Sequence, residues 1–216
     1  MKKVLSGFLT LCLIVSLVLT LSACGGGGNF IGKWKTTVDL SELINTSIAA
    51  EDAEMAKYLR VDGFAVDWSF TFNKDGTYAS ETDDASAEKA TENLRKSLED
   101  GMYDYLKSVI QDQGVGISVE EALEASGQSM EQLMDEMMES FDMDAILADL
   151  NVKGKFLVEK GVLYTSRNLN EDVDRLTGDY YKFDGKKLVL TGPMVTDGDE
   201  DESMNAIYPI TFEKVD

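Results

Sequence analysis

Three aspartates alternate near the end of the chain, at Asp197, Asp199 and Asp201. Carboxylates at this spacing open the twelve-residue calcium-binding loop, because Ca²⁺ prefers oxygen ligands. That loop also needs glycine at its sixth position and glutamate at its twelfth, where this chain has Glu202 and Tyr208. We therefore interpret the segment as a solvated acidic loop, with weak calcium binding as the alternative, and expect no defined metal site.

Four methionines recur at intervals of four, three and one residues, at Met130, Met134, Met137 and Met138. Thioether sulfurs can bind Cu(I), and flexible methionines can form an adaptable groove for a partner. Intervals of three and four are also those of the buried face of a helix. Core packing is therefore the preferred interpretation, and a partner groove and a copper site are the alternatives.

The composition argues against most enzyme classes. The 216 residues contain no histidine, which removes His-based proton transfer and His-containing metal sites. Ser86 and Lys89 have the Ser-x-x-Lys spacing of penicillin-recognising enzymes, but the partner motifs of those enzymes are absent, as are Walker and Gly-x-Ser-x-Gly motifs. The 40 acids and 20 bases give a net charge of −20, which disfavours nucleic acid. We expect no catalytic activity, no cofactor and no nucleic-acid partner.

Residues 1–23 combine two lysines, a long apolar run and a small-residue end, which is the pattern of a secretory signal peptide. The sequence Leu21-Ser22-Ala23-Cys24 that ends this segment resembles the lipobox of bacterial lipoproteins. The resemblance implies that Cys24 is lipidated, becomes the first residue after cleavage, and anchors the chain on the extracytoplasmic side of a membrane. An uncleaved membrane helix is the alternative, because the apolar run is long enough to span a bilayer.

Cleavage would change the charge and the cysteine content of the chain. Cys12 would be removed, and the remaining 18 bases and 40 acids would give a net charge of −22. Residues 24–29 hold four consecutive glycines, which predict a flexible linker between the anchor and the fold. We expect anionic headgroups to repel this domain because of its net negative charge, and no Lys/Arg cluster in the sequence suggests a second contact with the bilayer.

The pattern of residues 30–216 predicts one mainly β domain with a helical insertion at about 84–150. Bulky and polar residues alternate over 30–39 and 65–82, and again in several short segments between 155 and 215, which predicts strands. Helical spacing over 40–60 predicts one or two short helices between the first two strands. About eight antiparallel strands joined by tight turns can close into an up-and-down barrel.

The insertion has its own helix signals. Ser118 with Glu121, and Ser129 with Gln132, fit capping boxes that begin two helices. Gly101 lies inside an earlier apolar stripe, where glycine weakens a helix by about 1 kcal/mol relative to alanine, so we expect a kink there.

The first strand contains Gly32-Lys33-Trp34, which resembles the Gly-x-Trp signature of lipocalins and lipocalin-like bacterial lipoproteins. The resemblance implies an up-and-down barrel around a small apolar ligand, with Trp34 closing one end beneath a basic residue of the last strand. Lys214 occupies the matching position. Thr177-Gly178-Asp179-Tyr180 is loosely similar to a second lipocalin motif, with one added glycine.

An aromatic set on the strands could line such a ligand pocket. A barrel interior filled by its own side chains is the alternative. We therefore carry two hypotheses: a lipid-anchored protein that binds a small apolar ligand, or a non-enzymatic envelope module that contacts a protein through its helical insertion. The candidate lining residues are Trp68, Phe70, Phe72, Tyr78, Phe156 and Tyr181.

Overall fold

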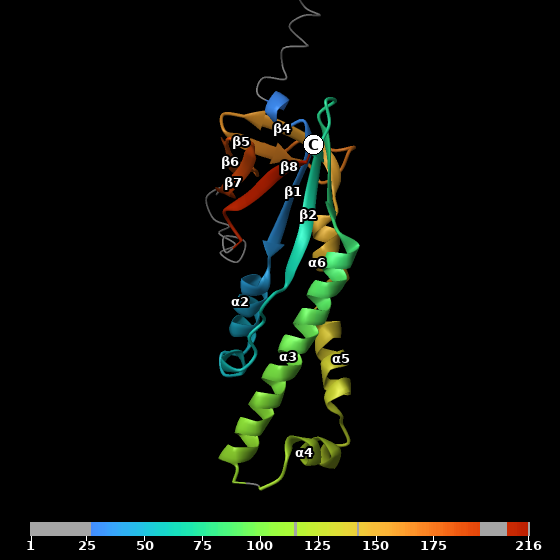
Figure 1. The fold of residues 1–216 in the computed structure, drawn as a ribbon, viewed down its shortest axis with the longest axis vertical. Helices are drawn as coiled ribbons and strands as arrows, with labels where there is room; N and C mark the ends of the chain where they lie inside the picture. Colours follow the sequence, from blue (N-terminus) through green and yellow to red (C-terminus); the bar gives the residue numbers. More distant parts are fainter. Residues whose placement is uncertain (1–26, 115, 142, 195–206, 216) are drawn as a thin grey trace, which may run out of the picture.

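Eight antiparallel strands form a closed barrel in the computed structural model, which describes residues 27–114, 116–141, 143–194 and 207–215 (Figure 1). Each strand pairs with its sequence neighbours, and β1 also pairs with β8, which closes the barrel. The predicted lipocalin-like, eight-stranded up-and-down fold is confirmed. The strands are β1 (Gly32–Asp39), β2 (Ala65–Phe72), β3 (Thr77–Thr82), β4 (Lys153–Glu159), β5 (Val162–Thr165), β6 (Asp179–Asp184), β7 (Lys187–Pro193) and β8 (Ile210–Val215).

The strands form where the sequence alternates. In β1, Trp34 and Val38 are buried, whereas Lys35 and Thr37 between them are exposed. Side chains of a strand point alternately to its two faces, so one face enters the barrel and the other meets solvent. The tight turn after Asn73 then reverses the chain, as its Asn-Lys-Asp-Gly sequence favours.

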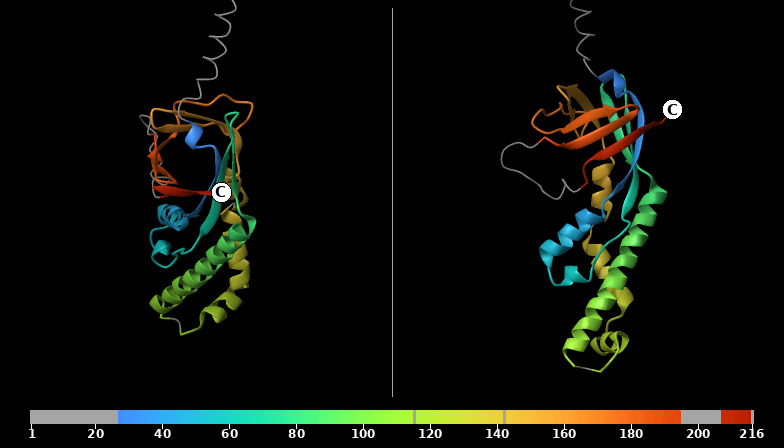
Figure 2. Two further views of the ribbon diagram at one scale, coloured as in Figure 1. Left: turned by 45° about the horizontal axis from the view of Figure 1, so that its top comes forward. Right: turned by 60° about the vertical axis from the view of Figure 1, so that its left-hand side comes forward.

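The helices lie in two insertions between strands. The first, between β1 and β2, holds α2 (Ser41–Glu51) and the 3₁₀ turn η2 (Met55–Lys57). The second forms what we call the helical arm, residues 84–150, which extends away from the barrel (Figures 1 and 2). The arm contains α3 (Asp84–Asp112), α4 (Val119–Ser126), α5 (Met130–Ser140) and α6 (Met143–Leu150). Outside the two insertions, a further 3₁₀ turn, η1 (Gly27–Asn29), precedes β1.

Both predicted capping boxes are present in the arm. Ser118 accepts a hydrogen bond from the Glu121 amide, and the Glu121 side chain accepts one from the Ser118 amide. The same reciprocal pair joins Ser129 and Gln132 at the start of α5. Each box satisfies backbone donors that a helix N-terminus would otherwise leave unpaired.

Gly101 lies inside α3, which continues through it as one helix of 29 residues. Gly101 is buried, and a side chain there would place its Cβ 2.6 Å from the carbonyl oxygen of Tyr58. The glycine therefore permits the close approach of the segment after η2 to the helix.

Two hydrophobic cores stabilise the molecule, one inside the barrel and one between the arm, α2 and the lower part of the sheet. Trp68 and Ile207 pack against both cores and join them. Met134 is 1% exposed, and the other three methionines of the stripe pack partly buried around the arm core, as the core interpretation predicts.

Candidate functional site

The two ends of the barrel differ. At the end where the described chain begins, β1 brings Trp34 directly opposite Lys214 of β8. Lys214 Nζ lies 5.1 Å from the centroid of the Trp34 ring, a cation–π contact. Gly32 has φ +123°, and a Cβ there would lie 3.0 Å from Lys214 Cε. Gly32, Trp34 and Lys214, which the sequence singled out, thus meet at one end, called here the closed end.

The closed end is sealed from inside by Phe30. The indole nitrogen of Trp34 donates a hydrogen bond of 2.6 Å to the Phe30 carbonyl, and the Phe30 side chain is fully buried. Its ring contacts Phe72, Tyr181 and Phe183 at centroid distances of 5.4, 4.7 and 5.1 Å, all edge-on. The chain therefore folds one of its own rings into this end of the interior.

The six candidate lining residues all belong to the barrel core, where five of them contact one another and Tyr181 contacts Phe30 and Phe183 instead. Phe70 and Phe72 stack at 5.6 Å, and Phe72 meets Phe156 edge-on at 4.8 Å. Phe70, Phe72 and Tyr78 are at most 9% exposed, whereas Trp68, Phe156 and Tyr181 stay partly exposed. Among the described residues, aromatic and aliphatic side chains pack against one another in the interior.

Trp68 also makes a structural contact that the sequence did not indicate. Its indole nitrogen donates a hydrogen bond of 3.0 Å to the carbonyl of Leu150, the last residue of the arm. The partner lies 82 positions away, so only the fold brings the two together. Trp68 is thus a joint between barrel and arm as well as an interior residue.

A partly buried polar pair lies at the end of the barrel that faces the arm. The Tyr208 hydroxyl donates a short hydrogen bond to Asp179 Oδ1. Burial raises the pKa of Asp179, although this hydrogen bond acts in the opposite direction. Burial and the Asp179 charge both raise the pKa of Tyr208. The loose Thr-Gly-Asp-Tyr similarity was the one sequence signal that pointed to Asp179.

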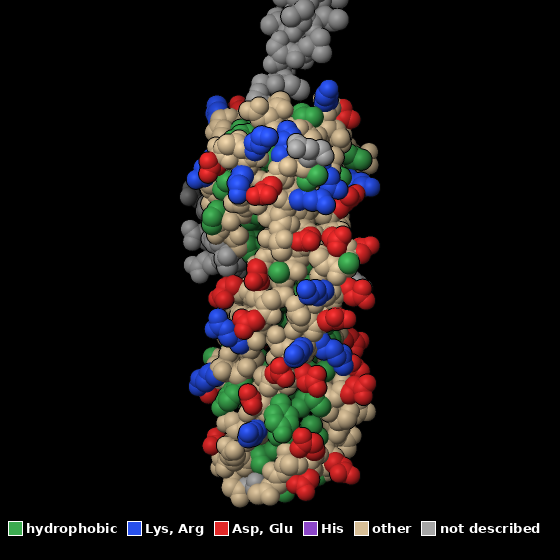
Figure 3. Space-filling model, in the orientation of Figure 1, with side chains coloured by type: hydrophobic (Ala, Val, Ile, Leu, Met, Phe, Trp, Pro, Cys, Tyr) green, Lys and Arg blue, Asp and Glu red, His purple; other side chains and the backbone are tan. Residues whose placement is uncertain are grey.

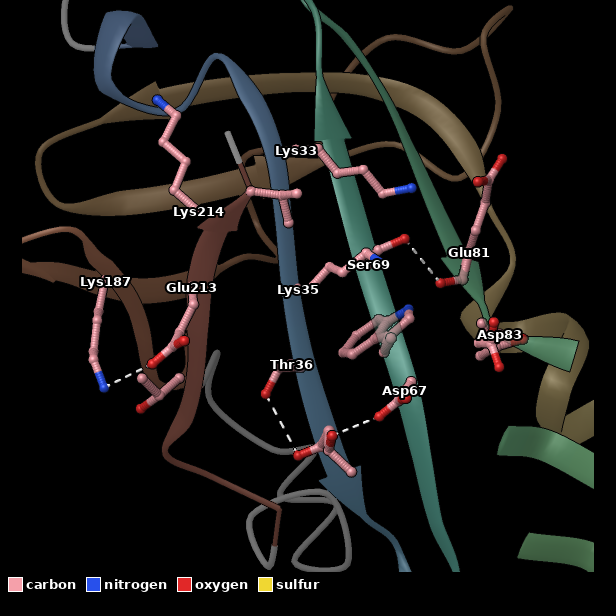
Figure 4. Close-up of a pocket in the computed structure, with 15 residues that line it drawn as sticks. Lys33, Lys35, Thr36, Asp67, Ser69, Glu81, Asp83, Lys187, Glu213 and Lys214 are labelled. Carbon is pink, nitrogen blue, oxygen red and sulfur yellow. Dashed lines mark hydrogen bonds and ion pairs between the residues drawn. The ribbon is translucent and has the colours of Figure 1, made fainter. Parts of the chain in front are cut away.

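A polar groove of about 1040 Å³ runs along the outer wall of the barrel (Figure 4). Lys33 and Lys35 of β1 extend toward the side of the groove that carries Asp67 of β2, Glu81 of β3 and Asp83. Lys187 Nζ lies 3.0 Å from Glu213 Oε1, and Thr37 Oγ1 lies 2.5 Å from Asp67 Oδ1. Sequence analysis missed this groove, although the alternating lysines Lys33 and Lys35 already marked the outer face of β1. Its charged lining suits a polar ligand rather than an apolar one.

The arm exposes apolar side chains within an acidic surface. Tyr58, Tyr103 and Ile117 are 36%, 39% and 42% exposed on or beside the half of α3 that is remote from the barrel. Residues 84–150 contain 17 acids and four bases. Figure 3 shows hydrophobic side chains gathered near the free end of the arm, with acidic side chains around them.

The described residues place no group of three or more Asp, Glu or Cys side chains where it could hold a metal ion. Asp197, Asp199 and Asp201 lie outside the described residues, as does Cys24. In the part of the chain that the structure describes, no helix has the length and hydropathy needed to cross a membrane. Comparisons with protein-family models, with curated proteins and with solved structures find no match to this chain.

Proposed function

We propose that the chain is a non-enzymatic, lipid-anchored module of the bacterial cell envelope that contacts a basic segment of another protein through its helical arm. The observation that carries this proposal is the packing of aromatic rings against one another in the barrel interior, which favours recognition at the outer surface. The barrel then serves as a rigid base that holds the arm.

The position of the predicted anchor supports the tether. Cys24 precedes the first described residue, Gly27, by three positions, and η1, which begins at Gly27, lies at the closed end (Figure 1). The arm projects from the other end. An anchor at Cys24 therefore leaves the arm accessible from the side away from the membrane.

The chemistry of the arm supports a basic partner. A surface with 17 acids and four bases repels anionic partners and attracts cationic ones. The exposed rings of Tyr58 and Tyr103 and the side chain of Ile117 offer apolar contact area within that surface. Aromatic anchors with a charged surround are typical of protein interfaces.

Lipidation is tested with a pair of cysteine variants in the bacterium. Incorporation of an alkyne fatty acid and recovery in the membrane fraction are measured for Cys24→Ser and for the matched control Cys12→Ser. We expect Cys24→Ser to lose the label and Cys12→Ser to keep it. Labelling of Cys24→Ser at the wild-type level would contradict the anchor.

The arm is tested by placing a photo-crosslinking amino acid at Gln128 on the arm, or at Thr211 on the outer wall of the barrel. Both positions are exposed. We expect a discrete adduct at Gln128 that maps to a Lys/Arg-rich segment, and that is lost in the variant Asp104→Lys/Glu124→Lys. An adduct that maps to an acidic segment, or one that survives the charge reversal, would overturn this function.

A small apolar ligand in the barrel is the second candidate. Its support is the fold itself and the three interior rings that stay partly exposed: Trp68, Phe156 and Tyr181. The test is mass spectrometry of organic extracts of the chain from Gly25 onward, beside Tyr181→Ala. Because Trp68 also holds the arm, Tyr181 is the safer position to change. A stoichiometric molecule lost in Tyr181→Ala would favour this candidate over the arm.

A further inference from the structure

Five lysines that are scattered in the sequence meet around the closed end of the barrel. In an up-and-down barrel the start of the first strand, the end of the last strand and every second turn lie at the same end. Here those places carry exposed or half-buried lysines. The lysine rim, as we call the set, consists of Lys33, Lys74, Lys160, Lys186 and Lys214.

Three carboxylates share the turns of the rim and neutralise it only in part. Glu159 Oε1 lies 3.9 Å from Lys160 Nζ, and Asp75 accepts hydrogen bonds from Thr77. Asp184 begins the turn before Lys186. Within the described residues, the rim lysines other than Lys160 form no ion pair.

The predicted anchor forces this rim close to the membrane. Gly27 lies three positions after Cys24, and an extended chain covers at most about 3.6 Å per residue, so the reach is about 11 Å. The Debye length at physiological ionic strength is about 8 Å, so charges at this distance still sense the headgroups. The four glycines therefore cannot lift the domain far from the surface.

Charge is distributed unequally along the molecule. The arm carries a net charge of −13, from 17 acids and four bases, whereas basic side chains gather over the barrel end (Figure 3). The 29 residues of α3 alone span about 43 Å at about 1.5 Å per residue, which places the free end of the arm several Debye lengths from the rim.

From this arrangement we infer that the lysine rim is a contact surface for an anionic lipid bilayer, and that the bilayer holds the acidic arm upright. The inference rests on the proposed anchor at Cys24. Rim lysines are attracted to anionic headgroups while the arm is repelled by them, so both effects favour the same orientation. The expectation that anionic headgroups repel the domain assumed that its charge is evenly distributed. The fold instead places the rim lysines at one end and the acidic arm at the other.

The experiment attaches the chain from Cys24 onward to vesicles through a maleimide lipid, so that it does not depend on lipidation in the bacterium. A donor dye at Gln128, introduced through an azide-bearing amino acid, reports energy transfer to an acceptor at the bilayer surface. Vesicles contain phosphatidylcholine alone, or phosphatidylcholine with one quarter phosphatidylglycerol. Asp216, which lies outside the described residues, is kept in every variant.

We expect transfer to be about twofold or more lower on the anionic vesicles, because the dye is then held at a distance set by the length of the arm. The difference should vanish at about 1 M salt, where the Debye length is about 3 Å. Equal transfer on the two kinds of vesicle at low salt would overturn the inference. Labelling of Cys24→Ser at the wild-type level would instead overturn the anchor, which the cysteine pair tests separately.

A matched pair of triple variants separates the rim from net charge. Lys33→Glu/Lys74→Glu/Lys186→Glu changes the rim, and Lys89→Glu/Lys96→Glu/Lys107→Glu makes the same charge change on the arm. We expect the first to raise transfer on anionic vesicles and the second to leave it low. The same response from both variants would show that total charge, and not the rim, sets the orientation. All six lysines that these variants replace are exposed or half-buried: Lys33, Lys74, Lys89, Lys96, Lys107 and Lys186.

Discussion

The indole nitrogen of Trp68 donates a hydrogen bond to the carbonyl oxygen of Leu150 at 3.0 Å, and this bond joins the barrel to the last residue of the arm. The same carbonyl accepts a bond of 2.7 Å from the Ser80 hydroxyl. Two neighbouring strands therefore hold one helix terminus, where backbone carbonyls lack partners within the helix.

Replacing Trp68 with phenylalanine keeps an aromatic ring but removes the donor. We expect the free energy of unfolding to fall by about 1–2 kcal/mol, because Leu150 keeps its bond to Ser80. Urea denaturation measures the loss, and hydrogen exchange should show weaker protection in α6. Adding Ser80→Ala should cost more than the sum of the two single changes, since the carbonyl then loses both partners. An additive result would argue against a shared joint.

A filled barrel makes a specific prediction for Phe72, which is 1% exposed and contacts four other rings. Phe72→Ala removes a ring from a packed interior and should lower the free energy of unfolding by about 3–5 kcal/mol. Tyr180→Ala, on a side chain that is 48% exposed, is the control and should change it by about 0.5 kcal/mol or less. A small effect at Phe72 would indicate that the interior already contains empty space.

Gly101→Ala sets helix propensity against packing. Alanine favours a helix interior by about 1 kcal/mol over glycine. Its Cβ, however, would lie 2.6 Å from Tyr58 O and 3.0 Å from the Cα of Leu59, and both are backbone atoms that cannot rotate away. We expect a net loss of about 1–3 kcal/mol in a thermal or urea transition. Asp104→Ala, at an exposed position of the same helix, should be close to neutral, and a stabilising Gly101→Ala would contradict the close approach.

Features that depend on neighbouring residues were predictable from the sequence. The alternation in β1 and β2 and the capping boxes at Ser118 and Ser129 each rest on residues within a few positions of one another. The barrel topology could also be predicted, because tight turns between consecutive strands leave few other topologies.

Features that join distant segments were not predictable. The bonds to the Leu150 carbonyl span 70 and 82 positions. The lysine rim could not be predicted without the strand order, which decides which turns lie at the same end of the barrel. The sequence predicted only that Gly101 weakens its helix, whereas the fold shows that the Tyr58 backbone lies against it. Aromatic residues at alternating positions could equally line a cavity or fill it, because the pattern fixes the direction of the rings and not the volume between them.

The partly buried pair of Asp179 and Tyr208 predicts how stability changes with pH. Burial raises the pKa of Asp179 above its ordinary value of 3.8, so the folded state binds the proton more tightly than the unfolded state does. The resulting stabilisation is complete below about pH 3.8 and is lost as the pH rises through the raised pKa. Asparagine keeps an oxygen that can accept the Tyr208 hydrogen bond but cannot ionise.

The measurement is the free energy of unfolding from about pH 3 to pH 8 for the wild type and for Asp179→Asn. The wild type should lose stability relative to Asp179→Asn as the pH rises. Tyr208→Phe removes the hydrogen bond that lowers the pKa of Asp179, so the same loss should move to higher pH. Tyr78, whose pKa the Asp179 charge also raises, is unchanged in both variants. A constant difference between wild type and Asp179→Asn would mean that Asp179 ionises alike in the folded and unfolded states.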